Sequence, residues 1–427
     1  MFDGKFPRMK NPNDDIRALI VSGEPFSDAT ATGITLCNLF GNFPREALAQ
    51  LYSANFPVRD DICAHYFQLS AANLISTRLV LTRDKPSVPV RGWKVRAKSA
   101  ARRVLSPFLE SLSYKLPPSI SEGIRVFNPN ILYTLGGSLR QLQIAIDISG
   151  EMNIPLAIHF MDDWPSILYR SPWLAPLRFR LHRLTTALVG QAKVRLAISE
   201  AMASEYHTRY QAEFVPFMNC VSRSKVRLPG TAISRDSKAR TICYFGGLHL
   251  GRWKSILSLA EAIKRHALNA EFELGIYCRD ADAEAHRKEF VGYSFVHFKT
   301  AVPPGQVSEV MEAADALLHV ESFLPEHRSY TRLSISTKIP EYLAANRPIL
   351  AIGPAEVASI QYLQDHRSAI VATDIDPDEM AKKVRQLLDR EVVAELGQNA
   401  FDLVMRNHLA ETERERFKKT LLEASTA

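Results

Sequence analysis

Two cationic side chains follow a glycine pair in the second half of the chain, in the stretch YFGGLHLGRWK. Gly246 and Gly247 come directly after an apolar run, and Arg252 and Lys254 stand where a helix is predicted to begin. Glycines let a backbone approach a ligand closely, and a helix start with added cations attracts phosphate. The spacing fits neither a dinucleotide-binding fingerprint nor a Walker loop. The stretch therefore predicts an anion site, although a tight turn with two solvated cations would explain it as well.

A second candidate is the stretch SISTKIPEYLAANRPILAIG. Ser336 or Thr337 is expected to cap a helix, and Pro340 is tolerated only in a first turn, so Lys338 is predicted within that turn. A cation there opposes the helix macrodipole, which a bound diphosphate would correct. Glu341, one turn later, could accept hydrogen bonds from the vicinal hydroxyls of a ribose. The simpler alternative is an ion pair between Lys338 and Glu341.

Polar side chains also lie at the carboxyl ends of two predicted strands. Glu321, Ser322 and Glu326 follow the run ALLHV and could contact a sugar or a phosphate, or form a solvated loop. Asp162 and Asp163 end the run IPLAIHFMDD. Paired acids can ligate a metal ion, but no other ligand cluster accompanies them, and either could simply cap the next segment.

The elements that would position these groups alternate as strand and helix along the chain. The predicted strands are short, continuous and apolar, as buried parallel strands are. A polar, basic stretch at 223–240 separates two such series. We therefore expect an α/β fold of two Rossmann-like, doubly wound parallel-sheet domains facing a cleft, at 1–222 and 241–400, followed by a helical segment at 401–427.

The composition indicates the class of protein, its compartment and the charge of its partner. The 427 residues are 46% hydrophobic and 23% charged, which is typical of a globular protein. The five cysteines form no C-x-x-C pair, so we expect free thiols in a reducing compartment. The N-terminus lacks the apolar core of a signal peptide, and we expect a cytoplasmic protein. A net charge of +7 favours an anionic partner, but no helix-turn-helix or stacking platform indicates nucleic acid.

One basic, amphipathic insertion interrupts the first domain at about 83–115. Its arginines and lysines alternate with apolar and aromatic residues such as Trp93 and Phe108. Such a stretch suits an anionic membrane surface, or it is an ordinary solvated helix. Binding to a membrane surface would place the protein at the inner face of a membrane, beside a lipid-linked acceptor.

The second half resembles the nucleotide-sugar-binding domain of GT-B-fold glycosyltransferases, and most closely the retaining, family-4-type (glycosyl transferases group 1) branch. The resemblance rests on the glycine pair with Arg252 downstream and on the hydroxyl-Lys-x-x-Glu-Tyr-Leu-Ala block at 336–350. It implies that Arg252 and Lys338 face the donor diphosphate and that Glu341 accepts hydrogen bonds from the donor ribose. No metal and no cofactor beyond the nucleotide-sugar co-substrate are implied.

The same resemblance extends loosely over the first half. Gly33 is similar to the glycine that opens the first helix beside the donor phosphate. The stretch 154–165 resembles the strand whose end faces the reaction centre, which implies that Asp162 and Asp163 meet the acceptor hydroxyl. The final helix would pack back on the first domain.

Three positions depart from the family pattern. Gly247 stands where the family has an arginine, Leu333 where it often has a glutamate, and Met161 where it often has a histidine. Contacts to the donor sugar that the missing glutamate would make could pass to Glu326 or Glu321.

The sequence thus predicts a glycosyltransferase that moves a sugar from a nucleotide-diphosphate donor to a hydroxyl of a saccharide or lipid-linked acceptor. Retention of configuration and a role in bacterial surface polysaccharide or glycolipid assembly are expected from the resemblance. A non-catalytic donor-binding subunit of a glycosyltransferase complex and a sugar-nucleotide epimerase of the same fold are the alternatives.

Overall fold

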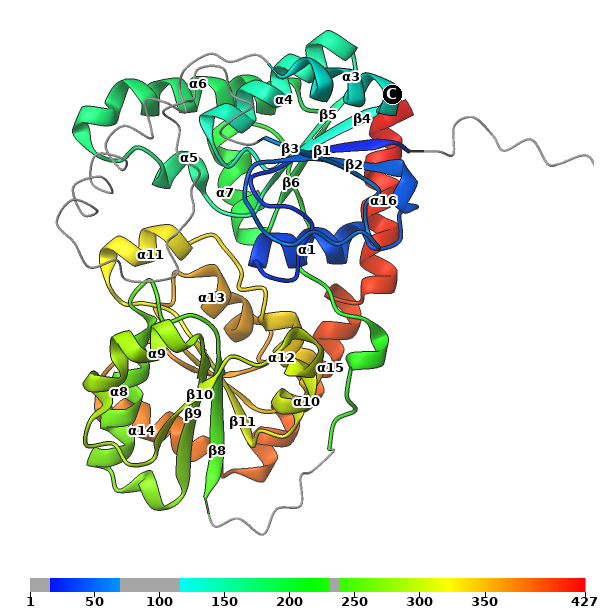
Figure 1. The fold of residues 1–427 in the computed structure, drawn as a ribbon. Coiled ribbons are helices and arrows are strands. Elements are labelled where there is room, and N and C mark those ends of the chain that lie inside the picture. The colour runs from blue at the N-terminus through cyan, green and yellow to red at the C-terminus, as the bar shows by residue number, and fades with distance from the viewer. Residues whose placement is uncertain (1–15, 70–115, 231–238, 427) are drawn as a thin grey trace, which may run out of the picture.

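Two α/β domains lie one above the other in the computed structural model, which describes residues 16–69, 116–230 and 239–426 (Figure 1). The basic insertion predicted at 83–115 lies outside the described residues. The five cysteines are all buried. Within the described ranges no helix is long and apolar enough to cross a membrane.

The first domain is built on a seven-stranded sheet in the order β3-β2-β1-β4-β5-β6-β7, with every neighbouring pair parallel. Its strands are β1 (Ala18–Val21), β2 (Leu48–Tyr52), β3 (His65–Gln68), β4 (Ile131–Thr134), β5 (Leu156–Phe160), β6 (Val194–Ala197) and β7 (Val215–Pro216). Its helices are α1 (Ala31–Phe40), α3 (Pro118–Phe127), α4 (Leu139–Met152), α5 (Trp164–Ile167), α6 (Ala175–Gln191) and α7 (Glu200–Tyr210), with the short turns η1 (Arg45–Ala47), η3 (Pro172–Leu174) and η4 (Arg223–Lys225).

The second domain repeats this plan with six parallel strands in the order β10-β9-β8-β11-β12-β13. Its strands are β8 (Arg240–Phe245), β9 (Phe272–Cys278), β10 (Val296–Thr300), β11 (Ala316–Val320), β12 (Ile349–Ile352) and β13 (Ile370–Ala372). Its helices are α8 (Arg252–Arg265), α9 (Asp280–His286), α10 (Val307–Glu312), α11 (Pro325–Thr331), α12 (Ile339–Ala345), α13 (Ala358–Asp365), α14 (Pro377–Gln386) and α15 (Arg390–Asn407), with the turns η5 (Leu268–Ala270), η6 (Arg287–Phe290) and η7 (Pro304–Gln306).

The central strands of both sheets are covered on both faces. Every residue of β1, β4, β5, β11 and β12 is buried, so continuous apolar runs indicated parallel strands correctly. In each sheet the order reverses beside the first strand, between β1 and β4 and between β8 and β11. Ligands of such sheets bind beyond the carboxyl ends of the strands at this reversal.

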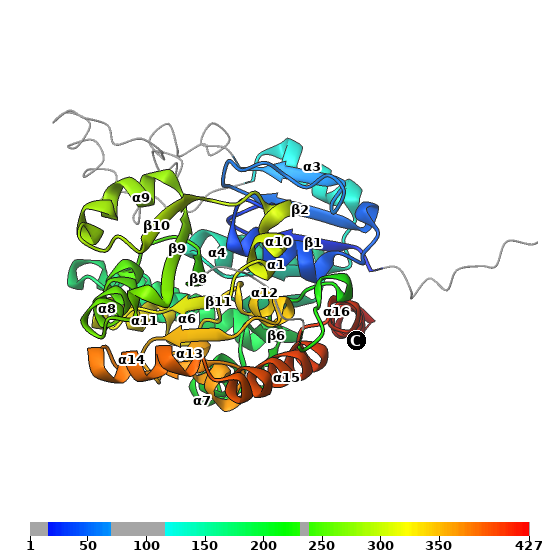
Figure 2. The same cartoon turned by 90° about the horizontal axis from the view of Figure 1, so that it is seen from below.

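The end of the chain crosses back to the first domain (Figure 1). The segment predicted as one helix from residue 401 is two: α15 ends at Asn407, and α16 (Ala410–Thr426) follows. Both Val221 and His408 are buried at the crossing, where Val221 N donates to His408 O. Phe417 of α16 is fully buried and packs edge-on against Phe40 and Phe217 of the first domain. Packing of the last helix on the first domain is therefore present in the structure (Figure 2).

Two helix starts differ from the sequence prediction. α1 begins at Ala31, so Gly33 lies inside its first turn, where its N–H donates to the Thr30 side chain. α12 begins at Ile339, so Lys338 is the residue before the helix rather than part of its first turn. Neither Ser336 nor Thr337 occupies the cap position, although Ser336 Oγ accepts from Lys338 N at 3.3 Å.

Candidate active site

The turn after β8 and the end of β11 bring an arginine against a buried glutamate. Arg252 is the first residue of α8, and its Nη2 lies 3.4 Å from both carboxylate oxygens of Glu321. Only 2% of Glu321 is exposed, so its charge needs a partner, and Arg252 supplies it. Glu321, predicted as a sugar contact, is thus the residue that holds the arginine in place.

The backbone around Arg252 is built for close packing. Gly251 has φ of 71°, and a Cβ there would lie 2.8 Å from Ser322 Oγ, so both conformation and space favour glycine. Ser322 is buried and accepts a hydrogen bond from Leu324 N. Ser255, one turn into α8, donates to Glu321 O at 2.7 Å. These contacts fix the start of α8 against the end of β11.

A buried histidine completes this cluster. His319 Nε2 lies 3.6 Å from a Glu321 carboxylate oxygen. Burial lowers the pKa of His319 to about 4, which outweighs the opposite influence of Glu321. The imidazole is therefore neutral near pH 7, and Arg252 carries the positive charge of the cluster.

From the first domain, Asp162 reaches this region at the end of β5. Its Oδ1 accepts a hydrogen bond from Ser334 Oγ of the second domain at 2.7 Å. The pKa of Asp162 is raised to about 6, mainly by burial and to a smaller extent by the nearby Glu24, against the lowering influence of Ser334 and Arg252. The carboxyl ends of β5, β8 and β11 therefore face one another across the domain boundary.

The neighbouring Asp163 turns the other way. It is buried, and its Oδ1 accepts hydrogen bonds from Tyr206 and Arg209, each at 2.7 Å. Burial would raise the pKa of Asp163, but Arg209 and Tyr206 together hold it below its usual range. The two aspartates predicted as an acceptor-facing pair thus separate, and only Asp162 contacts the second domain directly.

Lys338 and Glu341 pair with each other. Lys338 Nζ lies 2.9 Å from Glu341 Oε2, and both side chains keep about a quarter of their surface exposed. The simpler of the two sequence explanations therefore holds in this structure, and such a pair contributes only a few tenths of a kcal/mol. Both groups stay accessible to a ligand.

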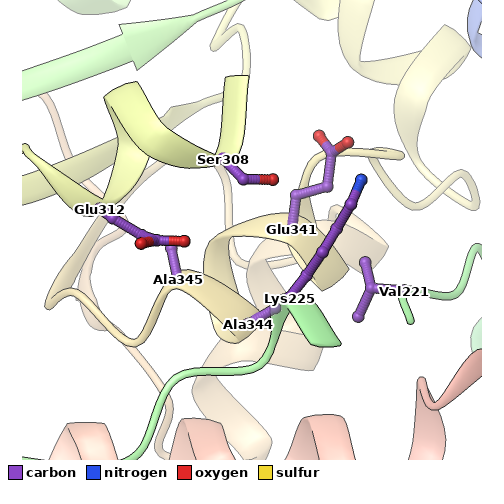
Figure 3. A pocket seen from close by; sticks show the side chains of 7 residues that line it. All are labelled: Val221, Lys225, Ser308, Glu312, Glu341, Ala344 and Ala345. Atoms are coloured by element: carbon purple, nitrogen blue, oxygen red, sulfur yellow. The ribbon is translucent and has the colours of Figure 1, made fainter. Parts of the chain in front are cut away.

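Glu341 also borders a small cavity of about 10 Å³, room for about one water molecule. Figure 3 shows the Glu341 carboxylate and the Lys225 ammonium pointing to the same side of this pocket, with Ser308 of α10 nearby. Lys225 belongs to the stretch predicted as a linker, and its place beside Glu341 had no signal in the sequence.

Other predicted residues lie around this centre. Lys254 is exposed, with its ammonium 5.6 Å from the centre of the Trp253 ring, and Glu326 is exposed in the first turn of α11. Thr337 contacts the first domain through its carbonyl oxygen, which accepts a hydrogen bond from the Asn219 side chain at 3.0 Å. These placements leave Arg252, Glu321 and Asp162 as the centre of the site.

The predicted glycines serve the protein's own packing. Gly246 and Gly247 form the turn after β8, where Gly247 O accepts from Tyr244 OH at 2.8 Å. A Cβ on Gly33 would lie 2.4 Å from Ser27 O, so the loop before α1 requires a glycine there. Among the described residues, no group of three or more His, Cys, Asp or Glu side chains is arranged to hold a metal ion.

Leu333, a departure from the family pattern, is an inter-domain contact. Only 4% of it is exposed, and it packs into the hydrophobic core of the first domain. Its carbonyl accepts from Ser199 Oγ at 2.8 Å. Met161 is likewise buried in that core. His159, on β5, points inward to the Tyr133 hydroxyl at 2.7 Å, and burial lowers its pKa to about 3.

Two doubly wound domains with their strand ends facing each other define a protein of the GT-B class. Residues 239–390 match the family described as "Glycosyl transferases group 1". The second domain therefore matches a glycosyltransferase family, and the chain as a whole has the GT-B fold. A comparison with curated protein sequences found no significant match.

Solved structures share the whole fold at low sequence identity. Sucrose-phosphate synthase from Thermosynechococcus elongatus superposes with a TM-score of 0.63 at 13% identity, covering 94% of this chain and 98% of that one. WaaG, a glycosyltransferase involved in lipopolysaccharide biosynthesis, gives 0.57 at 12% identity, covering 94% and 99%. A Listeria monocytogenes protein assigned as a UDP-N-acetylglucosamine 2-epimerase gives 0.52 at 11% identity, covering 94% of both chains. At these identities the likeness concerns the fold alone.

Proposed function

We propose that the protein transfers a sugar, with retention of configuration, from a nucleotide-diphosphate donor to a hydroxyl of a saccharide or lipid-linked acceptor. The observation that carries the proposal is the junction at Asp162. This carboxylate of the first domain meets Ser334 of the second and lies within electrostatic reach of Arg252. An acid on one side and a cation on the other are what an acceptor hydroxyl and a departing diphosphate require.

In this proposal each residue of the site has a separate role in binding or catalysis. Arg252, oriented by Glu321, and Lys338 stabilise the negative charge that develops on the leaving diphosphate. Glu341 accepts hydrogen bonds from the ribose once the donor displaces its pairing with Lys338. Ionised Asp162 accepts a hydrogen bond from the acceptor hydroxyl and orients it, while the departing phosphate takes its proton. No protein nucleophile is needed.

A screen of UDP-, GDP-, ADP- and dTDP-sugars by thermal shift tests the donor site, because a bound donor raises the unfolding midpoint. Arg252→Gln should then weaken donor binding by at least about tenfold, the scale of a hydrogen bond to a charged group. Lys254→Gln is the matched control, since it removes an exposed cation from the same helix. The donor site is refuted if none of the four donors shifts the midpoint, or if Arg252→Gln binds the donor as tightly as the native protein does.

The same assays separate the alternatives. A transferase releases the nucleoside diphosphate only when an acceptor is present and yields an acceptor-linked product. An epimerase of this fold consumes the donor without such a product, and a non-catalytic subunit binds the donor without consuming it. The proposed setting is bacterial surface polysaccharide or glycolipid assembly, in the cytoplasm at the inner face of the membrane.

A further inference from the structure

The region around α6 carries no acidic residue over a long stretch. Between Asp163 and Glu200 the sequence contains no Asp or Glu. Its cations are Arg170, Arg178, Arg180, Arg183, Lys193 and Arg195. An acid-free stretch of this length is unexpected in a chain with 46 acidic residues, and its own arginines and lysine give it a single sign of charge.

α6 exposes an aromatic side chain beside these cations. Leu177, Leu181 and Leu188 face the core and are buried, as the spacing of one helix face requires. Phe179, on the opposite face, is 70% exposed. Trp173, in the turn η3 just before the helix, is 49% exposed. The exposure of Phe179 is informative because contact of a large aromatic side chain with water is unfavourable unless a partner covers it.

Arg183 shares the exposed face of Phe179, and Arg178 flanks that face. Arg178 and Arg183 are both exposed, and Arg183 lies one helical turn after Phe179. Arg170, a few residues before the helix, donates to Ser329 of α11 at 2.6 Å. This hydrogen bond crosses the boundary between the domains, so the surface begins close to that boundary, on the side of α11 (Figure 1).

We propose that this surface, defined by Arg178, Phe179 and Arg183, docks on an anionic phospholipid bilayer. A helix that lies on a membrane buries aromatic residues among the acyl chains, while its arginines meet lipid phosphates. Single-stranded nucleic acid would instead stack its bases along aromatic residues in a groove, whereas Phe179 stands on the outer face of a helix. Docking here would bring a membrane-borne acceptor to the domain boundary.

Binding of the full chain to sedimented vesicles tests the proposal. Vesicles of phosphatidylcholine with and without phosphatidylglycerol are compared for the native protein and for the variant Arg178→Gln/Phe179→Ser/Arg183→Gln. Each cation at an anionic surface contributes about 1 kcal/mol, so the loss of two predicts about 30-fold weaker binding to the anionic vesicles, before any loss from Phe179. All three side chains are exposed, so the unfolding midpoint should not change.

A control variant removes two cations and one exposed apolar side chain from the second domain: Arg265→Gln, Lys288→Gln and Val291→Ser, all at exposed positions. This variant should bind like the native protein. Any contribution of the segment 83–115 is common to all three proteins. The proposal is overturned if the native protein does not sediment with anionic vesicles, if the α6 variant binds as the native protein does, or if the control loses as much. It is also overturned if the α6 changes abolish binding of a single-stranded oligonucleotide but leave vesicle binding intact.

Discussion

Replacing Ser334 by alanine should raise the pKa of Asp162 and leave the fold intact. Ser334 Oγ donates to Asp162 Oδ1 at 2.7 Å, and this bond favours the ionised carboxylate. A hydrogen bond to a charged group contributes about 1.5–3 kcal/mol. At about 1.4 kcal/mol per unit, its complete loss would raise the pKa by about 1–2 units. Because Asp162 is partly exposed, water replaces some of the bond, and we expect a rise of about half to one unit above the native value.

A higher pKa of Asp162 should also change how the activity depends on pH. Ionised Asp162 is the form that accepts the acceptor hydroxyl, so activity falls as the pH drops through its pKa of about 6. Without Ser334 this acid limb should move to higher pH. Carboxyl NMR of aspartate-labelled protein measures the pKa itself, with Asp162→Asn identifying the resonance, and does not depend on knowing the donor or the acceptor.

Ser329→Ala is the control for this experiment. It also removes a serine bond across the domain boundary, from Arg170 Nη1, but does not touch Asp162. The acid limb and the Asp162 resonance should titrate as in the native protein. If Ser334→Ala leaves the Asp162 pKa unchanged, the electrostatic reasoning is refuted. If both variants shift it equally, altered domain contact rather than the hydrogen bond explains the effect.

Three further changes test other parts of the structure. Asp163→Asn leaves Arg209 without its buried partner and should lower the free energy of unfolding by about 3 kcal/mol at pH 7. Because the pKa of Asp163 is lowered in the folded state, this contribution to stability should be lost as the pH falls below about 4. The control Asp147→Asn, at an exposed position, should leave the free energy of unfolding unchanged. Lys338→Ala should weaken donor binding by about 10- to 100-fold if Lys338 contacts the diphosphate, whereas unchanged affinity by titration calorimetry would leave only its ion pair with Glu341. Phe417→Ala should cost about 3–5 kcal/mol in denaturant unfolding because it empties a buried site lined by four aromatic rings, while Phe179→Ala, at an exposed position, should cost almost nothing.

The fold could be predicted from the sequence because buried parallel strands have a local signal. Runs such as ALIV at β1 and ILAI at β12 are apolar throughout, and Asn346 ends α12 in the left-handed conformation expected of a residue after a helix. The helix break at His408 lacked such a signal. No proline or glycine marks it, and the crossing is set by contacts with Val221, which is distant in sequence.

The site was predictable only where one element carries its chemistry. The cation at the start of α8 was evident from its own turn. The partners that define the electrostatics come from other elements: Glu321 was predicted as a ligand contact and proves to hold Arg252, while Ser334 was not singled out at all. A sequence shows which side chains follow a strand, but not which of them bond to each other, because the answer depends on the distance between the two sheets.

Leu333, which stands where the family often has a glutamate, makes a contact between the domains that explains the substitution. From the sequence, a leucine in place of a glutamate indicates only a lost polar contact to the donor sugar. In the structure, Leu333 is buried in the core of the first domain, and its carbonyl is bonded to Ser199, directly beside the bond between Ser334 and Asp162. A glutamate there would carry a charge into an apolar core, at a cost that only a buried cation could offset. The leucine therefore fits an apolar contact between the domains that places Ser334 against Asp162, and any contact to the donor sugar must come from other residues.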